Sequence, residues 1–303
     1  MIQYVQLVKR NILIYLRDKG AVFFSFLSMF VIICLMIFFL GDVNISELTD
    51  SLALLSDRNA AQDKKNALLL ILFWATGGII PVNAVMVTLS SYSSMVKDRN
   101  SRRADALYVL PIKRGTIASA YITSACLLSV FMCIMTFLFA ELFCFIKGAA
   151  LLSMIAHIKI FLMIFVNSFS YSAIMYLLAL LVKSEGAWSG LGTVTGTLVG
   201  FLGGIYMPIG QLSQTLQNIM KCTPVIYSSV MFRQILCKDI TDKIFNNVQN
   251  DIAEIYKETM GITLNLFGKN ISPVLCTLIL IVLGVLSLFI GIAVTEKVRK
   301  GKR

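Results

Sequence analysis

Long apolar runs constrain this chain more than any other feature of its sequence. Six of them follow one another, at residues 21–40, 67–91, 116–142, 151–182, 188–207 and 273–294. A helix needs roughly 20 residues to cross the hydrocarbon layer of a bilayer, so each run is long enough to span a membrane. Only 14% of the residues are charged, which is too few to cover a soluble domain of this length with polar groups. The sequence therefore predicts an all-α integral membrane protein with six transmembrane helices.

The first 20 residues have the pattern of an amphipathic helix. Polar residues share one side at helical spacing and apolar residues share another, with Gln3, Gln6, Arg10 and Arg17 on the first and Val5, Val8, Ile12 and Tyr15 on the second. The pattern predicts a helix that lies in the membrane interface, with Lys9, Arg10 and Arg17 as its basic residues. A cleavable signal peptide is the alternative. We favour a retained span, because run 21–40 is long and no small-x-small cleavage site follows it.

The distribution of charge predicts how the six spans are oriented. If the N-terminus is cytoplasmic, residues 1–20, 92–115, 183–187 and 295–303 face the cytoplasm. These segments carry 16 of the 27 Lys and Arg residues but only 5 of the 16 acidic residues. Short cytoplasmic loops are enriched in Lys and Arg, so the net charge of +11 reflects topology and requires no nucleic-acid partner. We expect a multi-pass protein of the plasma membrane with both termini in the cytoplasm.

The sequence carries few of the groups that catalysis or metal binding requires. The phosphate-loop pattern GxxxxGK[ST] and the patterns HExxH and GxSxG are all missing. A structural zinc site needs four clustered ligands, whereas the seven cysteines are scattered and His157 is the only histidine. We therefore expect no catalytic residue, metal or cofactor in this chain. Cys222 and Cys237 both fall in a predicted external segment, and the sequence leaves open whether they form a disulfide.

The fifth apolar run contains a regular series of glycines. Gly192, Gly196, Gly200 and Gly204 are spaced four residues apart. On a helix this spacing gives one smooth face, where another backbone can approach closely. Such a face can serve for helix packing within one subunit or as a seam between two subunits, and the sequence leaves both interpretations open.

The loop between the second and third runs is the most informative segment. A charged start leads into an apolar patch that ends at a proline, with Arg99, Arg102, Arg103 and Asp105 in the charged part and Leu107, Tyr108, Leu110 and Pro111 in the apolar part. Asp98 and Ser101 suit the start of a helix, and Pro111 suits its end. One interpretation is a basic loop that anchors lipid headgroups. The other is a short helix that inserts its apolar residues into a cytoplasmic partner.

This loop resembles that of the membrane subunits of type-2 ATP-binding-cassette (ABC) transporters, most of which are exporters. In that family a charged run leads into a short coupling helix, which is followed by a proline and a basic residue. Residues 97–114 follow the same order. Here Asp105 stands where a glutamate is often found, and the Gly-Thr-Leu that usually precedes the helix is missing. The order of apolar runs also matches the family along nearly the whole chain.

A second similarity to this family follows the fifth run. Members commonly show Gly-x-x-x-Pro there, and then Pro-x-x-Tyr before an arginine. The matching stretches of this sequence contain Gly204, Tyr206, Pro208, Pro224, Tyr227 and Arg233. The resemblance implies that residues 209–237 form short re-entrant helices on the external side. Residues 238–272 exceed what such a cap needs, and no role is predicted for them.

The resemblance also implies a division of labour between subunits. Two membrane subunits, either two copies of this chain or this chain with a related permease, would form a pathway in the lipid bilayer. Two separate cytoplasmic ATPase subunits would bind ATP and Mg²⁺, and the coupling loop 92–115 would dock on them beside the interfacial helix 1–20. A six-span domain at 21–294, with its external segment 209–272, would be followed by a basic tail at 295–303. The chain would then be no enzyme by itself.

Three function classes fit the predicted fold. We favour the permease of an ABC exporter, although a non-transporting immunity or sensor protein can share this architecture. A membrane-embedded lipid or peptide transferase would need clustered polar residues at one depth, and the sequence shows none. Because the spans hold few charges, we expect a hydrophobic or amphipathic cargo such as a drug or a peptide. A lipid-linked glycan is the alternative cargo.

Overall fold

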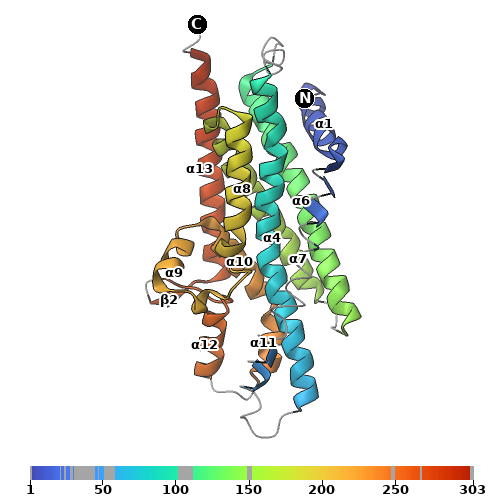
Figure 1. The fold of residues 1–303 in the computed structure, drawn as a ribbon, viewed down its shortest axis with the longest axis vertical. Coiled ribbons are helices and arrows are strands. Elements are labelled where there is room, and N and C mark those ends of the chain that lie inside the picture. Colours follow the sequence, from blue (N-terminus) through green and yellow to red (C-terminus); the bar gives the residue numbers. More distant parts are fainter. Residues whose placement is uncertain are drawn as a thin grey trace.

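Four long helices form the body of the protein. The computed structural model describes residues 2–20, 22–23, 25–27, 30, 45–46, 48–50, 59–101, 112–148, 152–246, 250–266 and 268–300. Within these residues four helices are long and apolar enough to cross a membrane, namely α4 (Ala60–Asn100), α6 (Arg114–Ile146), α7 (Met154–Leu181) and the part Pro273–Glu296 of α13 (Pro273–Lys300). They pack side by side as a bundle (Figure 1). The predicted helical membrane fold is thus confirmed.

Two of the six predicted runs lie outside these four helices. The fifth run corresponds to α8 (Glu185–Leu202), which has 18 residues and is less apolar because it is rich in Gly and Thr. It begins three residues before the predicted run at residue 188 and ends five residues before residue 207. Run 21–40 falls mostly outside the described residues. The number of six spans therefore stays a prediction.

The longest helix, α4, runs without a break past the residues that interrupt its predicted span. It has 41 residues and is therefore about 61 Å long. Asn59 begins it by accepting hydrogen bonds from the backbone N–H groups of the first turn. Gly77, Gly78 and Pro81 all lie inside the helix and are buried. A helix can retain such residues when neighbouring elements pack around the backbone groups that they leave exposed.

The predicted helix start at Asp98 is wrong, whereas a start at Ser101 would involve residues 102–111, which lie outside the described residues. Asp98 lies in the last turn of α4, and Ser101 follows the helix as its C-terminal cap. The Ser101 backbone N–H donates to the carbonyl of Lys97 at 2.9 Å. The side chains of Asp98 and Arg99 bind neighbouring helices, and these contacts extend α4 beyond the predicted end of its span.

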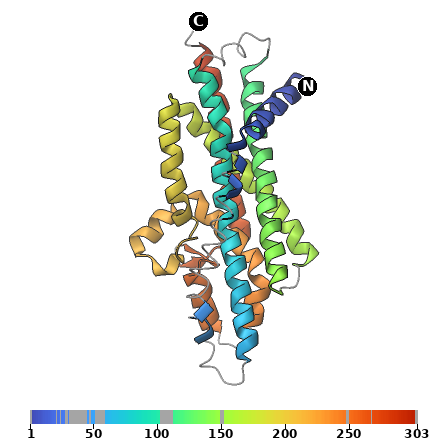
Figure 2. The ribbon, with the colours of Figure 1, turned by 45° about the vertical axis from the view of Figure 1, so that its right-hand side comes forward.

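The N-terminal helix α1 (Ile2–Arg17) lies beside α6, at the same end of the bundle as the C-terminal end of α13 (Figures 1 and 2). The hydroxyl groups of Tyr4 and Thr123 form a hydrogen bond of 2.6 Å between α1 and α6. The buried face of α1 consists of Leu7, Val8, Asn11 and Tyr15. Val5, predicted on the apolar side, is exposed, because α6 covers a face that is rotated from the predicted one.

A series of short elements occupies the predicted external segment. They are η2 (Ile209–Gln211), α9 (Gln214–Lys221), α10 (Pro224–Leu236), α11 (Lys238–Ile244), α12 (Asn250–Thr259) and the antiparallel strands β1 (Asn265–Leu266) and β2 (Lys269–Asn270). Gly204 turns the chain after α8 with φ of +61°, a left-handed conformation that glycine adopts without strain. Residues 209–237 are therefore short helices, as predicted. Their location outside the membrane stays a prediction.

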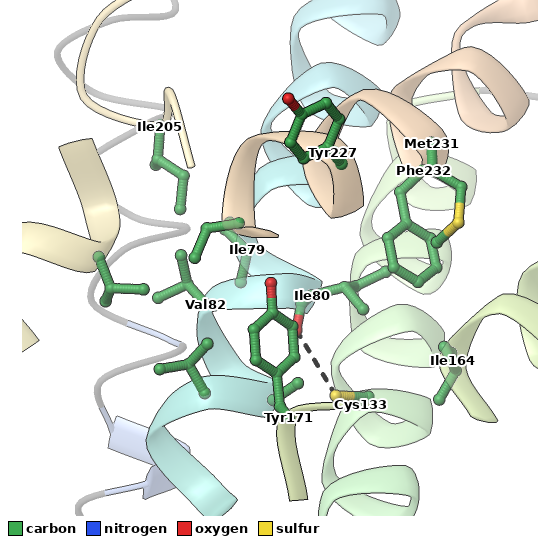
Figure 3. Packing of buried hydrophobic residues seen from close by; sticks show 14 of the residues in the cluster. Ile79, Ile80, Val82, Cys133, Ile164, Tyr171, Ile205, Tyr227, Met231 and Phe232 are labelled. Atoms are coloured by element: carbon green, nitrogen blue, oxygen red, sulfur yellow. Dashed lines mark hydrogen bonds between the residues drawn. The ribbon is translucent and has the colours of Figure 1, made fainter. Parts of the chain in front are cut away.

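Helix α10 is inserted into the bundle, where it packs on α4 and α13. Figure 3 shows its residues Met231 and Phe232 in one apolar cluster with side chains of α4, α6 and α7. Phe232 is fully buried, and burial of such a side chain contributes about 1.5–3 kcal/mol. The thiol of Cys133 donates a hydrogen bond of 3.5 Å to the carbonyl of Ile80 in the same region. The inserted helix is therefore part of the core.

Arg233 of α10 is fully buried, and its guanidinium binds two other segments of the chain. Its Nε donates to the carbonyl of Trp74 in α4 at 3.2 Å. Its Nη2 donates to the carbonyls of Gly203 and Gly204, just after α8, at 3.1 and 2.8 Å. The guanidinium also lies 4.4 Å from the centre of the Trp74 ring, which is a favourable cation–π contact.

The surroundings of Arg233 explain how a buried cation is tolerated. Burial lowers the pKa of Arg233 to about 9, so the side chain still carries its charge at neutral pH. Within the described part of the chain it has no carboxylate partner, and backbone carbonyls and the indole ring take that place. A Cβ atom added at Gly77 would lie only 2.7 Å from Cγ of Arg233, so this glycine leaves the room that the arginine needs.

We expect Arg233→Lys to destabilise the protein even though it keeps the charge. An ammonium group cannot reach the carbonyls of Trp74, Gly203 and Gly204 together, so buried acceptors lose their donors at a cost of about 2–3 kcal/mol. The midpoint of thermal unfolding of the detergent-purified protein should fall by several degrees. Lys243→Arg, the reverse exchange at an exposed position of α11, is the control. Equal midpoints for both variants would contradict this role of Arg233.

Candidate functional site

A cavity of about 750 Å³ lies between α8, α4 and α1. Its walls combine the C-terminal half of α4, most of α8 and the last residues of α1 with residue 18. The cavity is therefore built from three elements that are far apart in the sequence. Its size is that of a site for a drug-sized molecule.

The glycine face of α8 brings this helix close to α4. A Cβ atom added at Gly192 would lie 3.3 Å from the Leu89 side chain, and one added at Gly196 would lie 3.3 Å from Met86. Gly200 lies against the ring of Tyr206, and Gly204 lies beyond the end of the helix. These contacts are helix packing within one subunit, which is one of the two interpretations of the series. A seam between subunits stays a prediction.

Hydroxyl groups contribute uncharged polar groups to the lining of the cavity. Ser90, Ser93 and Ser94 line it from α4, and Ser189, Thr193 and Thr197 line it from α8. The hydroxyl of Thr193 donates to the carbonyl of Ser189 at 3.2 Å, and that of Thr197 to the carbonyl of Thr193 at 3.1 Å. Each oxygen can still accept a hydrogen bond from a bound molecule. Such walls suit a molecule that is largely apolar and carries a few polar groups.

Charged residues line the end of the cavity where α4 ends and α8 begins. Lys97 lies in the last turn of α4 and Glu185 begins α8, whereas Asp18, which follows α1, lines another part of the cavity. The same end of α4 immediately precedes residues 102–111, which lie outside the described residues. The cavity thus has ionised groups at the end where α4 ends, in addition to its hydroxyl groups.

An ion pair fastens α1 to the end of α4. A guanidinium nitrogen of Arg10 lies 2.5 Å from a carboxylate oxygen of Asp98, and the carboxylate side chain is largely buried. Burial alone would lower the pKa of Arg10, but hydrogen bonds with Asp98 and Tyr121 raise it above its ordinary value. Helix α1 is therefore bound directly to a residue of the predicted coupling loop 92–115, whose first part, through Asn100, belongs to α4.

The next residue, Arg99, fastens the end of α4 to α7. Its guanidinium donates to the carbonyls of Ala179 at 3.1 Å and Leu180 at 3.4 Å, and also to that of Val182. These carbonyls end α7, where a cation is favourable because the helix dipole is negative there. Arg99 was predicted to contact a partner subunit, but here its side chain binds within the chain. Asp98 and Arg99 together connect the C-terminal end of α4 to two neighbouring helices.

Most of the predicted partner contacts lie outside the described residues, namely Arg102, Arg103, Asp105, Leu107, Tyr108, Leu110 and Pro111. Of the basic residues of the interfacial helix, Lys9 and Arg17 are exposed and Arg10 is half-buried. The hydroxyl residues of the cavity were not predicted as site residues. The spacing of Ser90 to Ser94 and of Thr193 to Thr197, one helical turn each, was the signal that could have found them.

The predicted external motif is spread over several short elements. Pro208 precedes η2, and Pro224 begins α10. The ring of Tyr206 lies edge-on to that of Phe201, at 4.9 Å between centroids. The hydroxyl of Tyr227 donates to the carbonyl of Lys221 at 2.6 Å and so holds α9 to α10. Arg233 thus stands in the core, whereas Tyr206 is exposed.

The two cysteines of the predicted external segment are free thiols. Cys222 is exposed, whereas Cys237 is fully buried. Burial raises the pKa of Cys237 to about 12, which leaves its thiol protonated and unreactive. The structure therefore contains no disulfide between these two residues.

A comparison with protein families extends these observations. The family model described as ABC-2 family transporter protein matches residues 61–295, which include both α4 and α8. A comparison with curated proteins finds no match. The matched range covers most of the chain, so the resemblance noted in the sequence is confirmed. The family implies a membrane subunit that associates with an ABC ATPase and is not catalytic alone. The chain therefore belongs to the ABC-2 family of transporters, as a permease subunit.

Proposed function

We propose that this chain is the membrane half of an ATP-driven exporter of hydrophobic or amphipathic molecules, such as a drug or a peptide. The family match over residues 61–295 carries the proposal. A separate cytoplasmic ATPase binds ATP and Mg²⁺, and its cycle exposes the pathway to the two sides of the membrane in turn. Two copies of the chain, or this chain and a related permease, enclose that pathway.

The proposed topology has six spans in the plasma membrane and both termini in the cytoplasm. The position of α1 and the C-terminal end of α13 at one end of the bundle supports it (Figure 1). The bias of Lys and Arg toward the same segments supports the orientation. Helix α8 then serves as the fifth span, and run 21–40 serves as the first.

The cavity between α1, α4 and α8 is the proposed route of the cargo. Its hydroxyl lining supports cargo that has apolar and polar parts, because it offers hydrogen bonds without strong charge. Its charged end lies near the loop 102–111, where the ATPase is expected to dock. A movement of the loop would therefore reach the cavity wall directly through α4.

The links of Asp98 and Arg99 support the proposed coupling. Through Asp98, α4 is bound to the interfacial helix α1, and through Arg99 it is bound to the end of α7. A force on residues 102–111 is therefore transmitted to three helices together. The proposed coupling helix itself lies in the coupling loop 92–115 and includes Leu107, Tyr108 and Leu110.

The first prediction tests the ATPase contact. Replacing Leu107 and Tyr108 with glutamate should place charges in an apolar interface, and the ATPase should no longer co-purify from native membranes in mild detergent. At least a tenfold loss of co-purified ATPase activity is expected, with normal insertion of the permease into the membrane. Lys113→Glu, a similar change of charge at the end of the loop, is the control.

Retention of full ATPase binding by the Leu107/Tyr108 variant would show that the coupling helix is assigned wrongly. If the unaltered chain is recovered alone from several mild detergents, it acts as an immunity or sensor protein instead. Strict dependence of transport on a glycan-linked lipid would replace the drug or peptide cargo by a lipid-linked glycan.

The second prediction concerns the cavity. Replacing Thr193 and Thr197 with leucine fills part of the cavity and removes two hydrogen-bonding groups from its wall. Stimulation of ATP hydrolysis by an amphipathic dye such as rhodamine 6G should fall several-fold, while basal hydrolysis stays within about twofold. Val194→Leu, on an exposed part of the same helix, is the control. Unchanged stimulation in the threonine variant would remove the cavity from the pathway.

The third prediction concerns the ion pair between α1 and α4. Arg10→Asp and Asp98→Arg should each lower dye-stimulated ATP hydrolysis, and the double variant should recover part of the loss. Because Arg10 is partly exposed, the interaction energy from this double-mutant cycle should be about 1 kcal/mol. Lys9→Asp makes the same change of charge at an exposed neighbour and is the control. Additive losses in the double variant would exclude coupling through this pair.

A further inference from the structure

The predicted external segment contains a groove that the proposed pathway does not use. Two adjoining cavities, of about 640 and 220 Å³, lie between α9 on one side and α12 with strand β1 on the other. Both are lined by Gln217, Lys221, Glu258 and Asn265, and we name the whole the amide groove. Figure 1 shows α9, β2 and α12 together in the half of the molecule away from α1.

Helix α9 turns its polar residues toward this groove. Gln214, Gln217, Asn218 and Lys221 all line it. The exposed apolar residues of α9 are Leu216 and Ile219. Met220 is the buried apolar residue of this helix, Gln217 and Lys221 are half-buried, and Gln214 and Asn218 are exposed. The face of α9 toward the groove is therefore polar, and two of its polar side chains are partly shielded from water.

The walls of the groove are held in place by contacts on both sides. The hydroxyl of Tyr227 donates to the carbonyl of Lys221, which fixes the end of α9. On the other side, Gly210 of η2 lies so close to α12 that an added Cβ atom would be 2.6 Å from Cα of Thr259. Strand β1 is paired with β2. A site with fixed walls loses less entropy when it binds a ligand.

The groove presents one positive and one negative charge together with several amides. Lys221 and Glu258 line both cavities, and neither has an ion-pair partner among the residues that the structure describes. Each side-chain amide offers both a hydrogen-bond donor and an acceptor. A ligand that fits this lining alternates donors and acceptors and carries opposite charges.

We propose that the amide groove binds a polar peptide segment with one basic and one acidic side chain. The backbone of an extended peptide offers N–H and C=O groups in alternation, which the amides of the groove can match. The acidic side chain pairs with Lys221, and the basic side chain pairs with Glu258. The site is separate from the cavity between α1, α4 and α8, and binding does not require that the peptide is transported.

Cys222 provides a reporter for this proposal. It lines the groove and is the exposed cysteine among those in the described part of the chain. The experiment uses the Cys34→Ser variant in phosphatidylcholine nanodiscs. The rate at which Cys222 reacts with a fluorescent maleimide is measured. One probe is a pool of blocked hexapeptides with Lys and Glu at the ends and randomised Ser, Thr, Asn and Gly between them. A second pool has Gln at both ends.

The charged pool, at 1 mM, is expected to slow the labelling of Cys222 at least threefold, and the Gln pool is expected to slow it much less. The variant Lys221→Gln/Glu258→Gln should lose this protection. Lys238→Gln/Asp242→Asn, a matched pair of exposed residues outside the groove, should keep it. Protection is measured as the ratio of the Cys222 labelling rates with and without peptide. The ratio is compared between variants because a change at Lys221 also alters the reactivity of the neighbouring Cys222 thiol in the absence of peptide. Gel filtration and peptide-free labelling of each variant check that it is folded.

Four results would overturn the proposal. Labelling could proceed at the same rate with and without the charged pool, or the protection could survive in the Lys221/Glu258 variant. Equal protection by the two pools would show that the two charges do not select the ligand. Protection produced by phosphatidylethanolamine nanodiscs and by neither peptide pool would assign the groove to a lipid headgroup instead.

Discussion

The buried guanidinium of Arg233 is the interaction on which the arrangement of the less regular half of the protein depends. Helix α10 and the turn after α8 belong to a segment without a long apolar helix, and both reach α4 through this side chain. The carbonyls of Trp74, Gly203 and Gly204 replace the carboxylate that a buried cation usually requires. Trp74 also donates to the carbonyl of Met260 at 2.5 Å, which brings the loop before β1 to the same point.

This connection links the short elements between α8 and α13 to the helix that also lines the candidate pathway. Helix α4 holds Trp74 near Arg233, Met86 and Leu89 against α8, and Asp98 beside α1. One continuous helix therefore joins the inserted helix α10, the cavity and the start of the coupling loop. In the proposed transport cycle, α4 is the element through which a movement at the loop reaches the other end of the molecule.

The sequence predicted the features that depend on composition and local pattern. Apolar length predicted α4, α6, α7 and α13, and the four-residue spacing of Gly192 and Gly196 predicted the close approach of a second helix. The cavity was missed, because its hydroxyl residues come from helices whose pairing no local pattern specifies. The helix start at Asp98 was predicted wrongly for a similar reason, since its partner Arg10 is 88 residues away.

By itself, the sequence determined that this protein is a membrane permease of the ABC-2 family, because apolar runs and the order of short motifs depend only on the order of residues in the chain. Only the tertiary structure decided what the polar residues do. It placed Arg99 on the end of α7 instead of leaving it free for a partner, and it turned the polar face of α9 into a groove. Charges and hydroxyl groups act through distance and direction, which are defined only once the helices are packed together.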